Sequence, residues 1–545
     1  MKNNHRKDSM KDIANAKYVN LQVGDNDLIG NKFNGHDLHI NLRKMGIESS
    51  HLVWNKESDD DNTYVIAGEK QDRFAISVYN QYVQRLYDLD NVHNPLMYDI
   101  IYNQLFLDAD VVHLHLMHNG LWDLNLLPMM SKLKPIIWTV HDMWIATGDP
   151  HAKERPDYFF PYLTGAKNFD FNWELKKEAI KNSNITFVVA SKYMEQAMKE
   201  YPLFNDKKIV YVPFGLDFKL FYPRNNAVTR KELNLDVLEK LILLRGDGGI
   251  RKGLNYIDHV IKTLGKKYKL HFLIVGQNEL DIPDGVKATF YGWIKDDELM
   301  AKLYSVADLF LMPSTREYFG MMAMESMACG TLPIVLDGTS LPDTVNAPSC
   351  GVSTGQDMKE YSDAVEYYLN HPAERAAREK KCLNYVKKEH GMEKYLKSLD
   401  ALYRSEANDF KISSNFSQIL SGLKAINEIK PLQKAIVVDV SHMDITKYQE
   451  KNLFFETTMW PLKHEITRLS TENDVLMDRN NILLDENSIL RQDILDIYNS
   501  RRWKIISRVA NYKSYGDKFV NLIKHDGLYK ASKKIAKKVH NKSTK

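Results

Sequence analysis

Short apolar runs alternate with amphipathic stretches from about residue 17 to residue 370. Many of the apolar runs are continuous, which is typical of parallel strands that are buried on both faces. Helical patterns separate them, for example residues 34–45, which Gly46 closes, and residues 296–306. Strands that alternate with helices predict an α/β architecture. The predicted strands are residues 18–23, 50–53, 111–116, 136–140, 185–190, 241–244, 270–275, 288–291, 309–312 and 332–336.

The alternating region is too long for one open sheet. A break lies near its middle, where residues 212–217 read Val-Pro-Phe-Gly-Leu-Asp and combine proline with glycine. We therefore predict two Rossmann-like, doubly wound domains that face each other across a cleft, at residues 1–211 and 212–404. Ligands of such sheets bind at the carboxyl ends of the strands, so the cleft is the expected site.

The pattern changes after about residue 405. Residues 405–455 are polar and carry no clear periodicity, so we predict a linker without assigning it a structure. Residues 456–500 are predicted to form a coiled coil, because residues 462–497 repeat Leu or Ile every seven positions. Asparagines at three successive a positions favour a parallel homodimer; a heteromeric coil and an amphipathic helix packed on its own domain are the alternatives. The asparagines are Asn473, Asn480 and Asn487.

The net charge of +3 hides a strong asymmetry along the chain. Residues 501–545 hold 14 Lys and Arg against 2 acidic residues, so this predicted amphipathic tail carries +12 and the remaining chain −9. A basic block of this kind suits an anionic surface, either phospholipid headgroups or nucleic acid. The alternative is a solvated tail that only aids solubility.

The chain has 545 residues, 44% of them hydrophobic and 27% charged, which is a globular composition. Three cysteines exclude a disulfide scaffold and a zinc site of four cysteines, and they indicate a reducing compartment. The first twenty residues lack the apolar core of a signal peptide, and no run reaches the ~18 apolar residues that span a bilayer. We therefore expect a cytoplasmic protein, with peripheral attachment to the inner face of the cell membrane.

Residues 313–325 are the most informative segment of the chain. They follow the predicted strand 309–312, and a helix is expected to open near the glycine in their middle. A helix start binds phosphate or sugar oxygens through its backbone N–H groups, and carboxylates accept hydrogen bonds from vicinal hydroxyls. Taken singly, Glu317 is more often a residue that complements the helix dipole, and Glu325 more often a solvated surface residue. The expected backbone donors are those of Phe319, Gly320 and Met321.

Several motifs resemble those of retaining glycosyltransferases of family 4, which have the GT-B fold. The spacing Glu317–x7–Glu325 carries this resemblance, together with Ala328-Cys329-Gly330 and the strand that follows. The resemblance extends, in order, over roughly residues 17–400. Its other segments are the glycine-rich run from Arg245 to Gly253, the junction at residues 212–217, residues 109–115 and residues 138–144.

The resemblance implies roles for five residues. Arg245 and Lys252 would neutralise the diphosphate of a nucleotide-sugar donor, on which negative charge builds as the bond breaks. Glu325 would hold the ribose hydroxyls, Glu317 the hydroxyls of the donor sugar, and His141 would lie beneath that sugar. Glu317, His141, Arg245 and Lys252 are thus the expected catalytic set.

The donor-side loop departs from the family pattern. Many members carry a Gly-Gly pair after the first strand; here Gly30 and Gly35 are the candidates to approach the phosphates. Asp108-Ala109-Asp110 matches the Asp-x-Asp that binds Mn²⁺ in the other large glycosyltransferase fold. It leads directly into a predicted strand, however, and Arg245 and Lys252 already supply cations. We therefore expect no metal and no other cofactor.

Ser500-Arg501-Arg502-Trp503-Lys504 resembles a short segment near the ends of bacterial surface-polysaccharide glycosyltransferases. The resemblance thus implies a hexosyltransferase-like enzyme that moves a sugar, with retention, onto a surface or lipid-linked glycan. Its expected partners are a nucleotide-sugar donor, a glycan acceptor, an anionic membrane and a second copy of the chain. Two alternatives are a non-catalytic coiled-coil scaffold and a nucleic-acid-binding protein acting through its tail. The donor base, the sugar, the acceptor and the linkage stay open.

Overall fold

The computed structural model describes residues 18–433, apart from residue 29, most of residues 69–93, residues 118–121 and 147–168, and residues 248 and 278. The predicted coiled coil at residues 456–500 and the basic tail at residues 501–545 lie outside the described residues. Within the described part of the chain, no helix is both long and apolar enough to cross a bilayer.

The first half of the chain forms a parallel sheet of seven strands in the order β3-β2-β1-β4-β5-β6-β7. Every residue of β4, β5 and β6 is buried, as continuous apolar runs predict. Of the strands in this sheet, the sequence analysis missed the two at the edges, which have only three and four residues. The strands are β1 (Val19–Asn26), β2 (Glu48–Asn55), β3 (Thr63–Val65), β4 (Val111–His115), β5 (Ile136–Thr139), β6 (Ile185–Val189) and β7 (Lys208–Tyr211).

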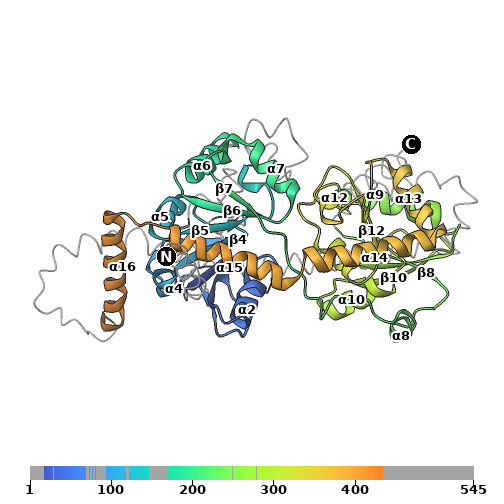
Figure 1. Cartoon of the computed structure of the whole chain (residues 1–545), viewed down its shortest axis with the longest axis horizontal. Helices are drawn as coiled ribbons and strands as arrows, with labels where there is room; N and C mark the ends of the chain where they lie inside the picture. Colours follow the sequence, from blue (N-terminus) through green and yellow to red (C-terminus); the bar gives the residue numbers. More distant parts are fainter. Residues whose placement is uncertain are drawn as a thin grey trace, which may run out of the picture. The chain divides into compact units, whose positions relative to one another are not determined.

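Helices connect these strands and lie around the sheet (Figure 1). The helical pattern predicted at residues 34–45 is present as α2, which Gly46 follows in a left-handed conformation with φ of 82°. The helices are α2 (His36–Lys44), η1 (Pro95–Tyr102), α4 (Gln104–Asp108), η2 (Leu124–Leu126), α5 (Leu127–Leu133), η3 (Trp144–Ala146), α6 (Phe169–Lys181), α7 (Lys192–Glu200) and η7 (Pro202–Phe204).

The second half forms a parallel sheet of six strands in the order β10-β9-β8-β11-β12-β13. The prediction of two doubly wound parallel sheets is therefore confirmed. The strands are β8 (Lys240–Arg245), β9 (Leu270–Val275), β10 (Lys287–Gly292), β11 (Leu309–Met312), β12 (Leu332–Leu336) and β13 (Val352–Thr354). The helices are α8 (Asn226–Glu232), η8 (Gly249–Lys252), α9 (Leu254–Leu264), α10 (Asp297–Val306), α11 (Met321–Ala328), α12 (Leu341–Thr344), α13 (Met358–Asn370) and α14 (Pro372–Glu389).

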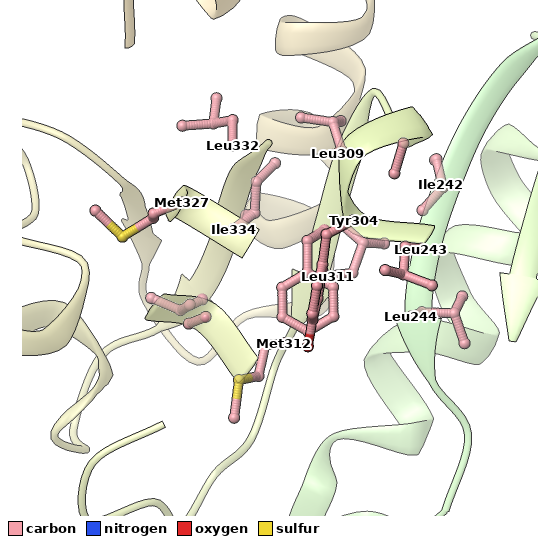
Figure 2. Close-up of a cluster of buried hydrophobic side chains, with 14 of the residues drawn as sticks. Ile242, Leu243, Leu244, Tyr304, Leu309, Leu311, Met312, Met327, Leu332 and Ile334 are labelled. Carbon is pink, nitrogen blue, oxygen red and sulfur yellow. The ribbon is translucent and has the colours of Figure 1, made fainter. Parts of the chain in front are cut away.

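The core of the second sheet is built from its three central strands. Figure 2 shows the side chains of β8, β11 and β12 gathered around Tyr304, which projects from α10. Ile242 pairs with Leu309, and Leu309 pairs in turn with Leu332, so that apolar side chains repeat across the sheet. Each of these side chains is completely buried, which stabilises the fold by about 1.5–3 kcal/mol per residue.

The last long helices return the chain to the first sheet (Figure 1). Helix α15 (Met392–Asp409) buries Leu399, Leu402 and Tyr403 in a cluster that also contains Val111 of β4 and Leu42 of α2. The predicted boundary at residue 404 places most of α15 in the second domain, whereas α15 packs on the first. The apolar stripe of a helix predicts a buried face, but it does not identify the sheet that the face covers.

Part of the predicted linker at residues 405–455 is helical. Residues 414–433 form α16 (Ser414–Gln433), which contacts η1, α4 and α5. Its Leu423 is buried, and Phe416 and Leu420 pack against the same core as Leu423. These three residues have the i, i+4, i+7 spacing of a helix face. The polar composition around them obscured this short periodicity.

Buried histidines are a feature of the first sheet. Burial lowers the pKa of His51 and of His113 from the ordinary 6.5 to about 3. His51 Nε2 donates to the carbonyl oxygen of Asn34 at 3.1 Å, and His113 lies 2.6 Å from both the Tyr403 hydroxyl and the Thr139 hydroxyl. Both rings are therefore neutral in the folded chain over most of the acidic range.

We expect the fold to lose stability in mild acid. Between about pH 6.5 and pH 3 the unfolded chain binds more protons than the folded chain, so stability falls as the pH is lowered. Each such histidine should contribute about 1.4 kcal/mol per pH unit to the free energy of unfolding. Denaturant unfolding of wild type and H51Q at several pH values measures this slope, because Gln can donate to Asn34 but takes up no proton. The exposed-site variant H371Q is the control; an H51Q slope equal to wild type would contradict the assignment.

Candidate functional site

Two loops meet at the carboxyl edge of the second sheet. One follows β8, which ends at Arg245, and the other follows β11, which ends at Met312. Gly253 has a φ of 80°, and a Cβ placed on it would lie 1.9 Å from the carbonyl oxygen of Pro313. The backbone N–H of Thr315 donates to the carbonyl oxygen of Arg251 at 3.0 Å. Glycine at position 253 therefore lets the two loops join, and α9 begins directly after it.

This junction brings together two of the residues singled out in the sequence. Lys252 Nζ lies 2.7 Å from Glu317 Oε2, and the two side chains are 26% and 18% exposed. Lys252 comes from η8 in the loop after β8, and Glu317 from the loop that precedes α11. A cation and a carboxylate that are 65 residues apart in the chain thus form a partly buried ion pair.

Arg245 also has a carboxylate partner, which the sequence analysis did not single out. Its Nη2 donates to Asp247 Oδ2 at 2.6 Å. The hydrogen bonds that Arg245 donates to Asp247, and then the charges of Asp247 and Glu317, raise the pKa of Arg245 despite its burial. Asp247 lies within the glycine-rich run, but a lone acidic residue there carries no pattern that would predict a pair. Both cations of the site are therefore held by carboxylates of the protein.

Helix α11 begins at the same edge. Its N-cap, Gly320, has a φ of 94°, and a Cβ on it would lie 2.4 Å from Leu341 Cδ2. The Phe319 side chain is buried, with its ring 5.0 Å from that of Phe214, whereas Met321 is half-buried. The predicted helix start is therefore present, and the conformation of Gly320 explains why glycine precedes it.

Glu325 is not a solvated surface residue. It is 5% exposed, and its Oε2 accepts a hydrogen bond from the Tyr304 hydroxyl at 3.0 Å. Burial and the charge of Glu325 raise the pKa of Tyr304 far above its ordinary value, so the phenol keeps its proton and donates. Glu325 Oε1 lies 3.1 Å from Nζ of Lys32, which comes from the loop after β1 in the first sheet. Neither Tyr304 nor Lys32 was singled out in the sequence.

The junction segment between the two sheets carries an aromatic cluster. The ring of Phe214 lies 5.7 Å from that of His141 and nearly parallel to it. Phe33, from the loop after β1, contacts both rings edge-on at 5.6 Å. His141 follows β5, so the predicted residue lies at the carboxyl edge of the first sheet beside the chain that enters the second.

The two candidate glycines of the donor-side loop differ. A Cβ on Gly35 would lie 2.9 Å from His115 Cδ2, and its φ is 96°. Both the close contact and the positive φ therefore favour glycine at this position. Gly30 also has a positive φ, 70°, but the nearest atom to a Cβ there is 3.9 Å away on Leu116. Close packing therefore explains Gly35, whereas at Gly30 only the backbone conformation favours glycine.

The Asp108-Ala109-Asp110 triplet lies away from this region. It precedes β4, at the amino edge of the first sheet, whereas the residues above lie at carboxyl edges. Asp110 Oδ2 accepts a hydrogen bond from the Val19 backbone at 2.8 Å, and Asp108 accepts one from the Gln104 side chain at 2.6 Å. Both carboxylates thus contribute to local structure at the edge opposite Arg245 and Lys252.

Comparison with known proteins finds sequence similarity in the part of the chain that forms the second sheet. Residues 225–388 match the family described as Glycosyl transferases group 1. A D-inositol 3-phosphate glycosyltransferase of Segniliparus rotundus is 30% identical over 168 residues, which are 28% of this chain and 37% of that protein. A GDP-mannose-dependent alpha-(1-6)-phosphatidylinositol dimannoside mannosyltransferase of Mycobacterium tuberculosis is 28% identical over 182 residues, 32% of this chain and 48% of that protein. The chain thus spans less than half of the length of these two relatives.

Solved structures extend the likeness over both sheets. Alr3699/HepE of Anabaena, in complex with UDP and glucose, aligns with 71% of this chain and 100% of its own, with a TM-score of 0.51 at 13% identity. At this identity the likeness concerns the fold alone. The two parallel sheets form a GT-B fold, and residues 225–388 are similar to the glycosyl transferases group 1 family.

We expect the approach of the two loops to depend on glycine at position 253. In Gly253→Ala, the new Cβ would overlap the Pro313 carbonyl and force the loops apart, which should cost more than the roughly 1–3 kcal/mol of an unfavourable φ alone. Gly249→Ala is a matched control in the same loop, with a φ of 61° and no atom within 4 Å of the added Cβ. Chemical denaturation of both variants compares the losses, and equal losses would show that the contact with Pro313 is unimportant.

Proposed function

We propose that this chain is a glycosyltransferase that moves a sugar from a nucleoside diphosphate donor to a growing glycan, with retention of the anomeric configuration. The observation that carries the proposal is the grouping of Lys252 and Glu317 beside Arg245 within the group 1 domain, at the carboxyl edge where such sheets bind ligands. Retention is supported by the resemblance of the Glu317–x7–Glu325 spacing to retaining enzymes.

Arg245 and Lys252 would stabilise the departing diphosphate. Negative charge accumulates on this group as the bond to the sugar breaks, and fixed cations lower the barrier most when they are already in place. Asp247 and Glu317 hold the two cations at 2.6 Å and 2.7 Å and so limit the reorganisation that the reaction requires. A dianionic diphosphate is a stronger partner for both cations than a single carboxylate.

The two glutamates would divide the recognition of the donor. Glu325, buried and fixed by Tyr304, would accept hydrogen bonds from the ribose hydroxyls. Glu317 would face the donor sugar from its place beside Lys252, and the amides at Phe319, Gly320 and Met321 would bind sugar or phosphate oxygens at the start of α11. At the carboxyl edge of the first sheet, the ring of His141 would lie beneath the same sugar.

We propose that neither a metal nor a cofactor takes part. Two cationic side chains occupy the position where a metal would otherwise neutralise the diphosphate. The triplet that could hold Mn²⁺ lies at the opposite edge of the first sheet, where Asp110 accepts a hydrogen bond from Val19. Turnover is therefore expected to continue in the presence of a chelator.

The acceptor is proposed to be a bacterial surface or lipid-linked polysaccharide, reached from the cytoplasmic face of the membrane. The segment from Ser500 to Lys504 supports this through its resemblance to surface-polysaccharide enzymes, and the +12 charge of residues 501–545 suits anionic headgroups. The mycobacterial relative is named as a phosphatidylinositol dimannoside mannosyltransferase, and phosphatidylinositol is a lipid. A dimeric coiled coil would bring two such tails to one end of the assembly.

A panel of UDP-, GDP- and ADP-hexoses tests the reaction. With a membrane extract as the source of acceptor, the wild-type chain should release nucleoside diphosphate from at least one donor, with or without EDTA. Lys252→Ala should lower kcat/KM roughly 30- to 1000-fold, which corresponds to a loss of about 2–4 kcal/mol of transition-state stabilisation. Lys262→Ala, which removes a surface lysine paired with Asp258 in the same domain, should match wild type.

Three results would count against this mechanism. No release of nucleotide from any donor would overturn the proposed activity. Normal turnover in Lys252→Ala would remove this residue from the mechanism. Loss of turnover in EDTA, restored by Mn²⁺, would establish a metal requirement.

The tail should bind the enzyme to anionic membranes. Sedimentation with vesicles that contain phosphatidylglycerol should be strong at low salt and weak at high salt, because about 1 kcal/mol per basic residue is lost on screening. Removal of residues 501–545 should abolish sedimentation but preserve donor turnover and the dimer. In L476D/L483D, by contrast, light scattering should report a monomer. Equal sedimentation with and without the tail would contradict its role in membrane binding. A monomeric wild type would contradict the predicted coiled-coil dimer.

A further inference from the structure

Lys32 joins the loop after β1 to two helices of the other domain. Its Nζ lies 3.1 Å from Asp297 Oδ1, at the start of α10, and 3.1 Å from Glu325 Oε1, within α11. The Lys32 side chain is 25% exposed and also lies over the ring of Phe221, 5.2 Å from its centroid. One ammonium group thus bridges the two sheets of the fold through two carboxylates.

The three charged partners differ in burial. The Glu325 side chain is 7% exposed, whereas that of Asp297 is 43% exposed. Burial alone would lower the pKa of Lys32, but the charges and hydrogen bonds of Glu325 and Asp297 outweigh it and raise the pKa. Lys32 therefore stays protonated, and with Tyr304 on Oε2 it leaves both oxygens of Glu325 engaged by protein donors.

We propose that Lys32 is a latch on the nucleotide position: it occupies Glu325 when no donor is bound and must release this carboxylate to the ribose. This inference rests on the proposed function, which assigns the ribose hydroxyls to Glu325. The Lys32 ammonium and the ribose hydroxyls are both donors, and they compete for Glu325 because its carboxylate is almost completely buried, with Lys32 on one oxygen and the Tyr304 hydroxyl on the other. Lys32 thereby sets the affinity of the site for every nucleoside diphosphate.

Asp297 provides a second carboxylate partner, which lowers the free-energy cost of releasing Glu325. Because Nζ lies equally close to both carboxylates, Lys32 can give up Glu325 and remain paired with Asp297. A buried ammonium without any partner would cost several kcal/mol, so an exchange without Asp297 would be unfavourable. The two residues should therefore have opposite effects: Lys32 opposes nucleotide binding, and Asp297 favours it.

Calorimetric titration of the full chain with UDP, GDP and ADP tests the latch. For the nucleotide that wild type binds best, Lys32→Met should lower the Kd by about tenfold, since Glu325 no longer has a competing donor. Asp297→Asn should raise the Kd by roughly threefold, since the displaced ammonium loses its remaining carboxylate. Lys32→Arg keeps the charge and should stay within about twofold of wild type.

The controls separate the latch from a purely structural ion pair. Lys302→Met removes a lysine of the same helix, α10, that pairs with Glu232 on the surface, and it should leave the Kd unchanged. Thermal unfolding shows whether each variant is folded. If Lys32 only stabilised the contact between the domains, Lys32→Met and Asp297→Asn would change the Kd in the same direction.

The outcomes distinguish the latch from the function on which it rests. Opposite shifts in Lys32→Met and Asp297→Asn support the latch. Unchanged or weaker binding by folded Lys32→Met, while wild type binds, would overturn the latch and leave the proposed function standing. Failure of wild type and every variant to bind UDP, GDP or ADP would overturn the proposed donor site itself, and the latch with it.

Discussion

Parallel strands that are buried on both faces have no surface on which to carry polar chemistry, so that chemistry is placed at their ends. In this chain every residue of β11 and β12 is buried, and the carboxyl edge carries Arg245 at the end of β8 and Lys252 and Glu317 in the loops. The apolar sheet fixes where the loops begin, and the approach at Gly253 fixes how closely they meet. The site is thus a product of two loops that the same core positions.

Pairing of charges is the second principle of this region. Lys252 is held by Glu317, Arg245 by Asp247, and Lys32 by two carboxylates. Partly buried charges require such partners, because an unpaired one would carry a large desolvation cost. An anionic ligand at the site would therefore exchange partners with groups that are already ordered, which keeps the cost of reorganisation low.

The first domain depends on a segment from the far end of the described chain. Tyr403 of α15 is completely buried, and its hydroxyl lies 2.6 Å from His113 Nδ1, inside the first sheet. His115, two residues further along β4, lies 2.7 Å from Gln22 and packs closely against Gly35 in the loop that carries Lys32. Helix α15 thus completes the core that supports the donor-side loop. Hydrogen bonds inside such a core add directional contacts that apolar packing alone does not supply.

The sequence by itself determined the class of fold. Continuous apolar runs separated by helical patterns predicted two parallel sheets, and Gly46 correctly placed the end of α2. The glycine between Glu317 and Glu325, which follows a predicted strand, predicted a helix start there, because such signals depend on neighbouring residues. The short edge strands β3, β7 and β13 were missed, since three or four residues give too little periodicity.

Only the tertiary structure decided which distant residues meet. The pairing of Lys32 with Glu325 joins residues 293 apart, and the hydrogen bond from Tyr304 comes from a helix whose pattern predicts only burial. The sequence likewise did not predict that α15 returns to the first sheet, because an apolar stripe can pack on any apolar surface. Local periodicity determines the elements, whereas the partners of a side chain depend on the packing of the whole domain, which no short stretch of sequence encodes.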